Sequence, residues 1–226
     1  MTARFCRLGL CEYQAAYALQ TRLAAERAAG ERGDLFLLTE HPGVFTLGRR
    51  GGLDNLMVTR ESLAEAGIPL VPIERGGDIT YHGRGQLVLY PIIHLRQAGL
   101  SVTEYVFRLE ELMLRLARDC GVEAGRDSRN HGIWVEDRKL GSVGIAIRHG
   151  VAFHGLALNV NLSLSPFSWI RPCGLSGVRM TSLSSERGVE IGLEQATRHI
   201  LRHLGDIFLR DFQEIEISEI HSAEAA

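Results

Sequence analysis

Residues 132–161 have the sequence GIWVEDRKLGSVGIAIRHGVAFHGLALNVN, and this stretch decides the fold class. It contains three strand-like runs, Gly132–Glu136, Lys139–His149 and Val151–Asn161, separated by only one or two residues. Connections this short permit only antiparallel pairing, because a parallel crossover needs roughly a dozen or more residues. The pattern therefore predicts a three-stranded antiparallel meander.

The middle run of this meander predicts two contrasting faces, because side chains alternate along a strand. Lys139 shares a face with Val143, Ile145 and Ile147 if no bulge interrupts the run. Small side chains on a strand leave room for another backbone or for a ligand. The opposite face has mostly small side chains, at Leu140, Ser142, Gly144 and Ala146.

Four segments outside the meander predict helices. Residues 101–120 have the clearest helical period, with one apolar face and Gly121 as the stop signal. Helical spacing also covers residues 12–29, 59–66 and 193–212, and the apolar run Leu35–Leu38 suits a buried strand. Helices separated from an antiparallel meander favour an α+β fold over a doubly wound α/β fold.

The composition is that of a soluble globular protein. The chain has 226 residues, of which 45% are hydrophobic and 23% charged, and its formal net charge of −2 gives no basic surplus for nucleic-acid binding. No run approaches the ~18–20 apolar residues of a membrane span, and residues 1–10 lack the features of a secretory signal. We expect one catalytic domain over residues 1–212, a flexible C-terminal tail over 213–226, a cytoplasmic location and no membrane partner.

Lys139 is the only lysine in a chain with 24 arginines. Arginine does not give up its proton under ordinary conditions, whereas lysine does so once it is desolvated. The lone lysine is therefore either a survivor of arginine-biased coding or a residue whose proton is needed.

The four cysteines are too few for a disulfide scaffold and lack metal-ligand spacing, so we expect reduced thiols and no zinc site. Cys120 lies on the apolar face of a predicted helix, as an inert buried thiol does. Cys173 lies between Pro172 and Gly174, which predicts a turn or loop, where reactive groups are commonly held. A neighbouring base or cation makes such a thiol nucleophilic, and Lys139 or one of the nine histidines can supply it.

Residues 75–86, RGGDITYHGRGQ, combine four glycines with polar side chains. Glycines permit close approach of the backbone to a ligand. The segment lacks the Lys-Ser/Thr ending of a P-loop. A glycine-rich hairpin without any ligand has the same pattern, so the segment is a weak signal by itself.

Five motifs together resemble the octanoyltransferases of lipoate biosynthesis. They are EHPGVFTLGR at residues 40–49, RGGDITYHG at 75–83, RKLGSVG at 138–144, FHGLALNVN at 153–161 and PCG at 172–174, in the family's order. Arg84 is a departure, since the family usually has proline at that position. Arginine removes the φ restraint that proline supplies, which affects the local loop geometry rather than the chemistry.

The resemblance implies a fold like that of biotin and lipoate ligases, related to class II aminoacyl-tRNA synthetases, with a mixed, largely antiparallel sheet flanked by helices. It implies transfer of octanoyl from octanoyl-acyl carrier protein to a lysine of lipoyl domains, on 2-oxoacid dehydrogenase E2 subunits and glycine-cleavage H protein. It also implies that no cofactor, ATP or metal takes part. Cys173 would carry the acyl group as a thioester, and Lys139 would stabilise the thiolate and serve as general base. A monomer is our default.

The resemblance also assigns acyl binding to three segments. These comprise Arg75, Gly76, Gly77, Asp78, Ile79, Thr80, Tyr81 and His82, then Ser142, Val143 and Gly144, and finally Gly155, Leu156 and Ala157. Backbone amides in these turns are candidates for an oxyanion hole. His82 and His154 receive no catalytic role.

Three alternatives stay open. The first is an ATP-dependent lipoate or biotin ligase on the same fold, which would not need Cys173. The second is a hydrolase or amidotransferase in which Cys173 pairs with His154 or His82. The third is a relative without activity that only binds acyl carrier protein or lipoyl domains. Formation of an acyl-enzyme without ATP separates the octanoyltransferase from the first and the third.

Overall fold

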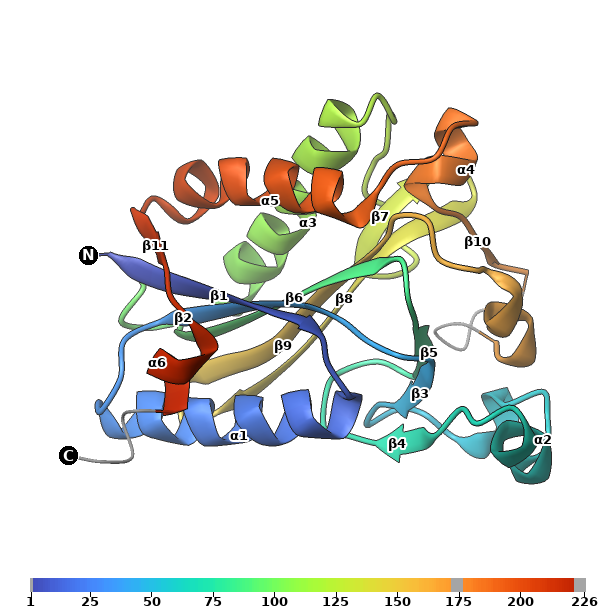
Figure 1. Cartoon of the computed structure of the whole chain (residues 1–226), viewed down its shortest axis with the longest axis horizontal. Helices are drawn as coiled ribbons and strands as arrows, with labels where there is room; N and C mark the ends of the chain where they lie inside the picture. The colour runs from blue at the N-terminus through green and yellow to red at the C-terminus, as the bar shows by residue number, and fades with distance from the viewer. Residues whose placement is uncertain (1, 172–176, 222–226) are drawn as a thin grey trace.

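The computed structural model describes residues 2–171 and 177–221, and its centre is a mixed sheet of eight strands (Figure 1). The spatial order is β10-β8-β9-β6-β2-β1-β11, and β7 pairs with β8 beside this path. The strands are β1 (Ala3–Leu10), β2 (Leu35–Glu40), β6 (Gln86–His94), β7 (Gly132–Val135), β8 (Arg138–Arg148), β9 (Val151–Asn159), β10 (Arg179–Met180) and β11 (Phe212–Glu214).

Helices cover both faces of this sheet (Figure 1). α3 (Val102–Asp119) and α5 (Leu193–Phe208) pack on one face, where Leu112 and Leu204 belong to the same buried cluster. α1 (Tyr13–Ala29) packs on the other face, with Leu23 buried beside Phe153 of β9. Burial of one apolar helix face against a sheet is the main source of stability for such helices.

A smaller sheet lies beside one end of the large one. It consists of β4 (Leu70–Pro72), β3 (Val44–Leu47) and β5 (Ile79–His82), in that order. Its own apolar cluster includes Phe45, Tyr81 and Phe167. The elements around this cluster are the short helices η1 (Leu53–Asn55), α2 (Arg60–Glu65) and η2 (Ser165–Trp169).

The predicted meander is confirmed. β7, β8 and β9 pair antiparallel in sequence order, and β6 continues the antiparallel pairing on the far side of β9. Only β1 with β2, β1 with β11 and β8 with β10 are parallel among the pairs of the large sheet. The α+β class and the mixed, largely antiparallel sheet flanked by helices are therefore as expected.

The predicted face of Lys139 is wrong, because the β7–β8 pairing has an irregularity. Ile133 is opposite Gly141, but Trp134 is opposite Lys139, so β8 has one extra residue at this point. Such a bulge reverses the alternation on one side of it. Leu140 belongs to the cluster under α3, whereas Lys139 lines a cavity together with Ser142.

The predicted helices are present with shorter ends. The capping box that Ser101 and Glu104 form at the start of α3 satisfies amide groups that would otherwise lack partners. α5 ends at Phe208 rather than at 212, because Leu209 adopts a left-handed conformation. The chain then turns into β11, which the helical pattern did not predict.

The segment after residue 212 packs against the N-terminal strand as far as the structure describes it. β11 pairs in parallel with β1, and the short helix α6 (Ile217–His221) follows it. Ile215 and Ile220 are both buried in the cluster under α1. The tail expected from residue 213 thus begins with ordered structure up to residue 221.

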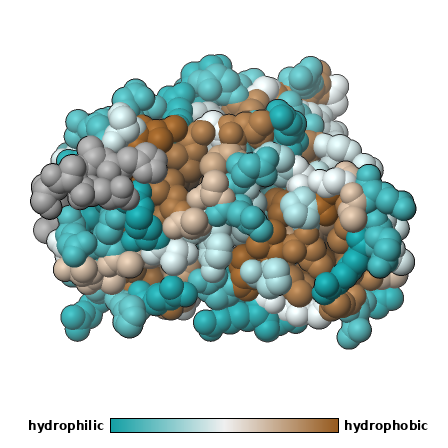
Figure 2. Space-filling model, turned by 60° about the horizontal axis from the view of Figure 1, so that its bottom comes forward, coloured by the Kyte–Doolittle hydropathy of each residue, from teal (hydrophilic) through white to brown (hydrophobic). Residues whose placement is uncertain are grey.

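The surface around α1 and α2 mixes hydrophilic and hydrophobic residues, as Figure 2 shows. Within residues 2–171 and 177–221, none of the helices has the length and apolar character needed to cross a bilayer.

Candidate active site

A cavity lies over the middle of the large sheet, between β6, β8 and β9 and the segment that leads into β5. It measures about 560 Å³ including its open mouth. Its floor consists of Ser142 opposite Ala157, Ala157 opposite Val88, and Gly144 opposite Gly155. Because these side chains are short, the sheet leaves space above it instead of filling that space with its own side chains.

The segment 75–78 forms the roof of this cavity by crossing over β8. The amide of Gly76 donates to the carbonyl of Ile145 at 2.9 Å, and Arg75 Nη2 donates to the carbonyl of Thr46 at 2.8 Å. These bonds tie the roof to both sheets. Gly77 has φ +92, a conformation that other residues rarely adopt.

The neighbouring turn supports the roof from outside. A side chain at Gly48 would place its Cβ 2.5 Å from the carbonyl oxygen of Gly77, and the amide of Arg50 donates to that same oxygen at 3.0 Å. Gly48, in the motif at residues 40–49, is therefore needed for close contact between two backbone segments.

Lys139 is fully buried and lines the cavity near the start of β8. Its Nζ donates to the carbonyl of His131 at 3.0 Å and is 5.0 Å from the ring centre of Trp134. Asn130 lines the cavity next to it, and the carbonyl of Asn130 accepts a hydrogen bond from Trp134 Nε1 at 3.4 Å. The only amine side chain in the chain is thus held by a carbonyl and an aromatic ring.

Two buried histidines near the cavity are held neutral. Burial lowers the pKa of His82 to about 3 and that of His41 to about 4, from 6.5. Nδ1 of His82 is 2.7 Å from Gln86 Oε1, and Nε2 of His41 is 2.7 Å from the hydroxyl of Tyr90. These hydrogen bonds and the stacking of His82 on Tyr13 give both rings structural partners.

His154 lies at the other end of the cavity from Lys139. It pairs with Ile145, six positions along β8 from Lys139, which is roughly 20 Å of extended strand. Burial lowers its pKa, so the ring is neutral at pH 7. Its Nε2 is 3.6 Å from Glu74, whose carboxylate also accepts from the hydroxyl of Tyr17 at 2.6 Å. A proton transfer at Lys139 does not involve His154 directly.

The pKa of Glu74 is lowered to about 2, through its contact with His154 first and the Tyr17 hydroxyl second. The pKa of His154 is lowered as well, so at neutral pH its ring carries no positive charge. It faces Glu74 as a neutral imidazole, beside a carboxylate that stays ionised. Glu74 and Tyr17 therefore lie next to the neutral ring of His154, which lines this end of the cavity.

The structure brings the three predicted acyl-binding segments together around one cavity, although their roles stay predictions. Of these residues, only Tyr81 is not among the cavity-lining side chains. Strand alternation explains this, because Thr80 and His82 face the cavity while Tyr81 packs against Phe45 and Phe167 in the smaller sheet's cluster. Cys173 lies outside the residues that the structure describes.

Sequence reasoning missed five residues that line the cavity: Tyr13, Val88, Tyr90, Asn130 and His154, the last of which received no binding role. Val88 and Tyr90 have even positions in β6, so the period of that strand groups them on one face. Tyr13 and Asn130 reach the cavity only through the packing of α1 and of the loop before β7, and no local pattern marks them.

The three described cysteines do not offer a thiolate. Burial raises the pKa of Cys6 and of Cys120 to about 11, and burial also raises the pKa of Cys11. All three thiols are protonated at neutral pH. Among residues 2–171 and 177–221, no three His, Cys, Asp or Glu side chains are grouped so that they could hold a metal ion.

Comparison with known sequences gives extensive matches. The family profile described as the lipoyl protein ligase A/B catalytic domain matches residues 12–205. An octanoyltransferase from Desulfotalea psychrophila is 55% identical over 204 residues, covering 89% of this chain and 92% of that protein. An octanoyltransferase from Syntrophobacter fumaroxidans is 45% identical over 215 residues, covering 95% and 94%.

Comparison with solved structures supports the fold. The bipartite lipoate protein ligase from Thermoplasma acidophilum matches with a TM-score of 0.75 at 17% identity, covering 99% of this chain and 90% of that one. The biotin protein ligase from Aquifex aeolicus matches with a TM-score of 0.51 at 10% identity, covering 92% and 69%. At these identities the likeness concerns the fold alone.

Proposed function

The chain belongs to the lipoyl protein ligase A/B catalytic domain family, and from that premise we propose that it is an octanoyltransferase. It would move octanoyl from octanoyl-acyl carrier protein to a lysine of lipoyl domains, the first step of protein lipoylation. The observation that carries this proposal is the cavity with small side chains on its floor and the only lysine of the chain at one end.

The octanoyl chain would lie along the floor between β8 and β9, with its thioester end near Lys139. Ser142, Ala157 and Gly144 provide the room there, and Val88 provides apolar contact. Burial of the alkyl chain stabilises the complex by roughly 0.8 kcal/mol for each buried methylene. The neutral ring of His154 would close the far end of the cavity, beyond the methyl group.

In the first half-reaction, the thiolate of Cys173 attacks the thioester carbonyl of the donor. The carrier thiolate leaves and takes a proton from the Lys139 ammonium, so that an octanoyl-Cys173 thioester and a neutral amine at Lys139 remain.

In the second half-reaction, the acceptor lysine attacks this thioester with its neutral amine. Lys139 accepts the proton that the attacking nitrogen loses, the amide forms, and Cys173 leaves as a thiolate. Lys139 and Cys173 are thereby restored, and no ATP is consumed.

The acceptors would be lipoyl domains of 2-oxoacid dehydrogenase E2 subunits and the glycine-cleavage H protein. The Thermoplasma acidophilum ligase with the same fold is described together with its E2 lipoyl domain. We propose a monomer that acts without a cofactor in the cytoplasm.

An ATP-dependent ligase is the second candidate, because solved structures with this fold include a lipoate-protein ligase A bound with ATP. That likeness is at 17% identity, whereas the octanoyltransferases are 45–55% identical to this chain. The closer sequences favour acyl transfer without ATP.

Intact-protein mass spectrometry decides between the two. Wild-type protein incubated with octanoyl-acyl carrier protein in the absence of ATP should gain one octanoyl group, and addition of a lipoyl domain should remove it. Cys173→Ser is the matched control and should gain none, since a hydroxyl is far less ionised than a thiol. A wild-type protein that stays unmodified until ATP and a free fatty acid are added would contradict the proposal.

A further inference from the structure

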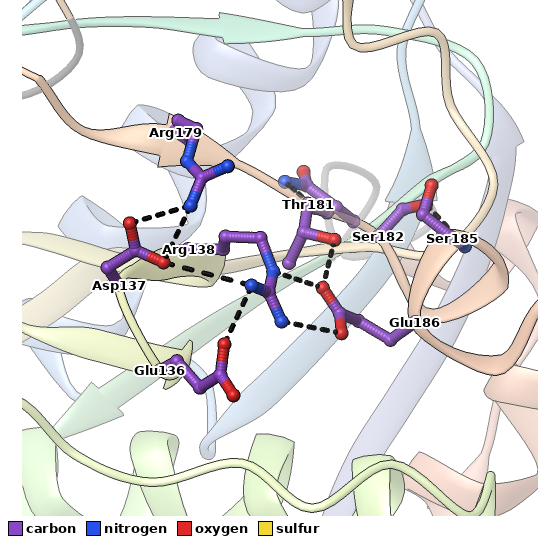
Figure 3. Close-up of polar contacts among 9 residues, drawn as sticks. Glu136, Asp137, Arg138, Arg179, Thr181, Ser182, Ser185 and Glu186 are labelled. Carbon is purple, nitrogen blue, oxygen red and sulfur yellow. Dashed lines mark hydrogen bonds and ion pairs between the residues drawn. The ribbon is translucent and has the colours of Figure 1, made fainter.

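A polar cluster surrounds Arg138, the residue that precedes Lys139 in β8 (Figure 3). Because side chains alternate along a strand, this cluster lies on the side of β8 opposite to Lys139 and to the cavity that Lys139 lines. The guanidinium of Arg138 donates to both carboxylate oxygens of Glu186, at 2.8 and 3.1 Å, and to Glu136 at 2.8 Å. Glu186 belongs to α4 (Leu183–Arg187), so the pair joins α4 to the first residue of β8. A bidentate arginine–carboxylate pair fixes orientation as well as distance.

Thr181 connects this ion pair to the backbone of Lys139. Its hydroxyl donates to Glu186 Oε1 at 2.6 Å, and its amide donates to the carbonyl of Lys139 at 3.0 Å. Its own carbonyl accepts from Asn159 Nδ2 at 2.9 Å. Because Thr181 is 3% exposed, all three hydrogen bonds lie inside the protein.

These contacts hold an otherwise weak edge of the sheet. β10 has two residues, Arg179 and Met180, which pair in parallel with Arg138 and Lys139. So short a strand has few ladder hydrogen bonds of its own. Its register beside Lys139 therefore depends on Thr181 and on the ion pair behind it.

The same chain of contacts continues toward the cavity. Asn159 accepts from Gln86 Nε2 at 2.9 Å, and Gln86 Oε1 is 2.7 Å from Nδ1 of His82. The cluster behind β8 is thus linked to a residue that lines the cavity as well as to the backbone of Lys139.

We propose that Arg138 and Glu186 are positioning residues: through Thr181 they hold the backbone at Lys139 in place and so fix its amine in the cavity. Arg138 and Lys139 are neighbours whose side chains extend to opposite faces, so the ion pair acts from behind the strand. The catalytic meaning of this role rests on the proposed octanoyl transfer.

If the Arg138–Glu186 pair only stabilised the fold, its loss would have a different effect from the loss of a positioning role. The side chains of Arg138 and Glu186 are 26% and 15% exposed. Partly exposed ion pairs contribute little to folding stability, and the loss of such a contribution would leave the activity of a folded variant intact. By contrast, a misplacement of about 1 Å in a reacting group costs on the order of 100-fold in rate.

The single lysine allows a direct test. Acetic anhydride, followed by hydroxylamine to remove esters and thioesters, leaves stable acetyl groups on the ε-amine of Lys139 and on the α-amine of the chain, and the second serves as the internal standard in mass spectrometry. Glu186→Gln and Arg138→Gln, neither of which adds a lysine, should each increase the rate of Lys139 acetylation about tenfold. The double variant should be no faster than the faster single one, because the two residues act as one pair.

Arg179→Gln is the matched control. It breaks the ion pair with Asp137 in the same cluster, where the two side chains are 66% and 53% exposed, and it does not affect Thr181. Lys139 should stay as protected as in the wild type. Octanoyl transfer should fall roughly 10- to 100-fold in kcat for the Glu186 and Arg138 variants only, with KM for the donor unchanged because the cavity side chains are unaltered.

Wild-type protection of Lys139 and wild-type kcat in Glu186→Gln would overturn the proposal. A loss of activity that follows thermal denaturation, with no change in the amine reactivity of the folded protein, would also overturn it. If Glu186→Gln does not fold, Arg138→Gln breaks the same ion pair from the other side and answers the same question. Failure of the wild type to transfer octanoyl would refute the proposed function, while the amine measurement would still test the positioning.

Discussion

Lys139 has no exposed surface, and its amine is surrounded by the carbonyl of His131 and the ring of Trp134. A guanidinium is larger and planar, and it does not give up its proton under ordinary conditions. Lys139→Arg should therefore retain part of the thiolate stabilisation at Cys173 but fail as a base, whereas Lys139→Ala should lose both.

The test compares two rates in the two variants, the alkylation of Cys173 and the transfer of octanoyl. Alkylation of Cys173 by iodoacetamide at pH 7 should decrease more in the Ala variant than in the Arg variant. Octanoyl transfer to a lipoyl domain should fall by at least about 100-fold in both, the size typical of losing a general base. Transfer by Lys139→Arg at the wild-type rate would show that the proton of this residue is not used.

The buried His82 predicts a loss of stability in mild acid. Its pKa is lowered from 6.5 to about 3 in the folded protein, so the unfolded chain binds the additional proton between these two values. The stabilisation is complete above pH 6.5 and declines as the pH falls toward 3, by about 1.4 kcal/mol per pH unit.

Urea unfolding of the wild type and of His82→Asn tests this sign. Between pH 6.5 and 5 the wild type should lose roughly 2 kcal/mol more of its free energy of unfolding than the variant does. His149→Asn, the same substitution in the exposed turn after β8, is the control for removing an imidazole elsewhere in the chain. Parallel curves for all three proteins would mean that His82 is not buried as a neutral ring.

At the scale of elements, the facing strands β8, β9 and β6 set the space for the acyl chain. Ala157 lies between Ser142 and Val88 in adjacent strands on the cavity floor. Ala157→Val would add two methyl groups there. A change of one methylene in an apolar pocket alters binding by about 1–3 kcal/mol.

Ala157→Val should therefore lower kcat/KM for an octanoyl thioester by roughly 10- to 200-fold relative to a hexanoyl thioester. Val88→Ala should change the preference in the opposite direction. Competition between the two thioesters, followed by the mass of the acylated protein, gives the ratio, and thermal melting checks that both variants fold. An unchanged ratio in both would place the acyl chain elsewhere.

At the scale of the whole molecule, the C-terminal segment closes the edge of the sheet at β1. Ile220 of α6 is fully buried under α1, while Ile217 in the same helix is 40% exposed. Ile220→Ala should cost about 2–5 kcal/mol, the usual loss for a buried isoleucine. Ile217→Ala, the same substitution on the exposed side, should change stability by less than about 0.5 kcal/mol.

Chemical denaturation of the two variants gives the comparison. Octanoyl transfer in the folded state should be equal in both, because α6 follows β11 at the edge of the large sheet opposite to β8, the strand that contains Lys139. Equal stabilities would indicate that the segment after residue 212 is not packed against the sheet.

Much of the local structure could be predicted from the sequence. The meander over residues 132–161 and the helices near 12–29, 59–66, 101–120 and 193–212 follow from hydrophobic periodicity and short connections. β1 and β11 could not be predicted, because their parallel pairing joins the two ends of the chain and leaves no signal in either segment alone. Such pairing depends on which distant strand is available.

The sequence by itself determined the family and the residue types that the proposed chemistry needs, including the lone Lys139 and the small residues of the three acyl-binding segments. Only the tertiary structure decided on which face Lys139 lies, because the bulge at Leu140 arises from pairing with β7. It also decided that the side chain of Tyr81 packs in the cluster of the smaller sheet instead of lining the cavity. Alternation within a strand is a local property, but the register between strands is set by contacts over long sequence separations.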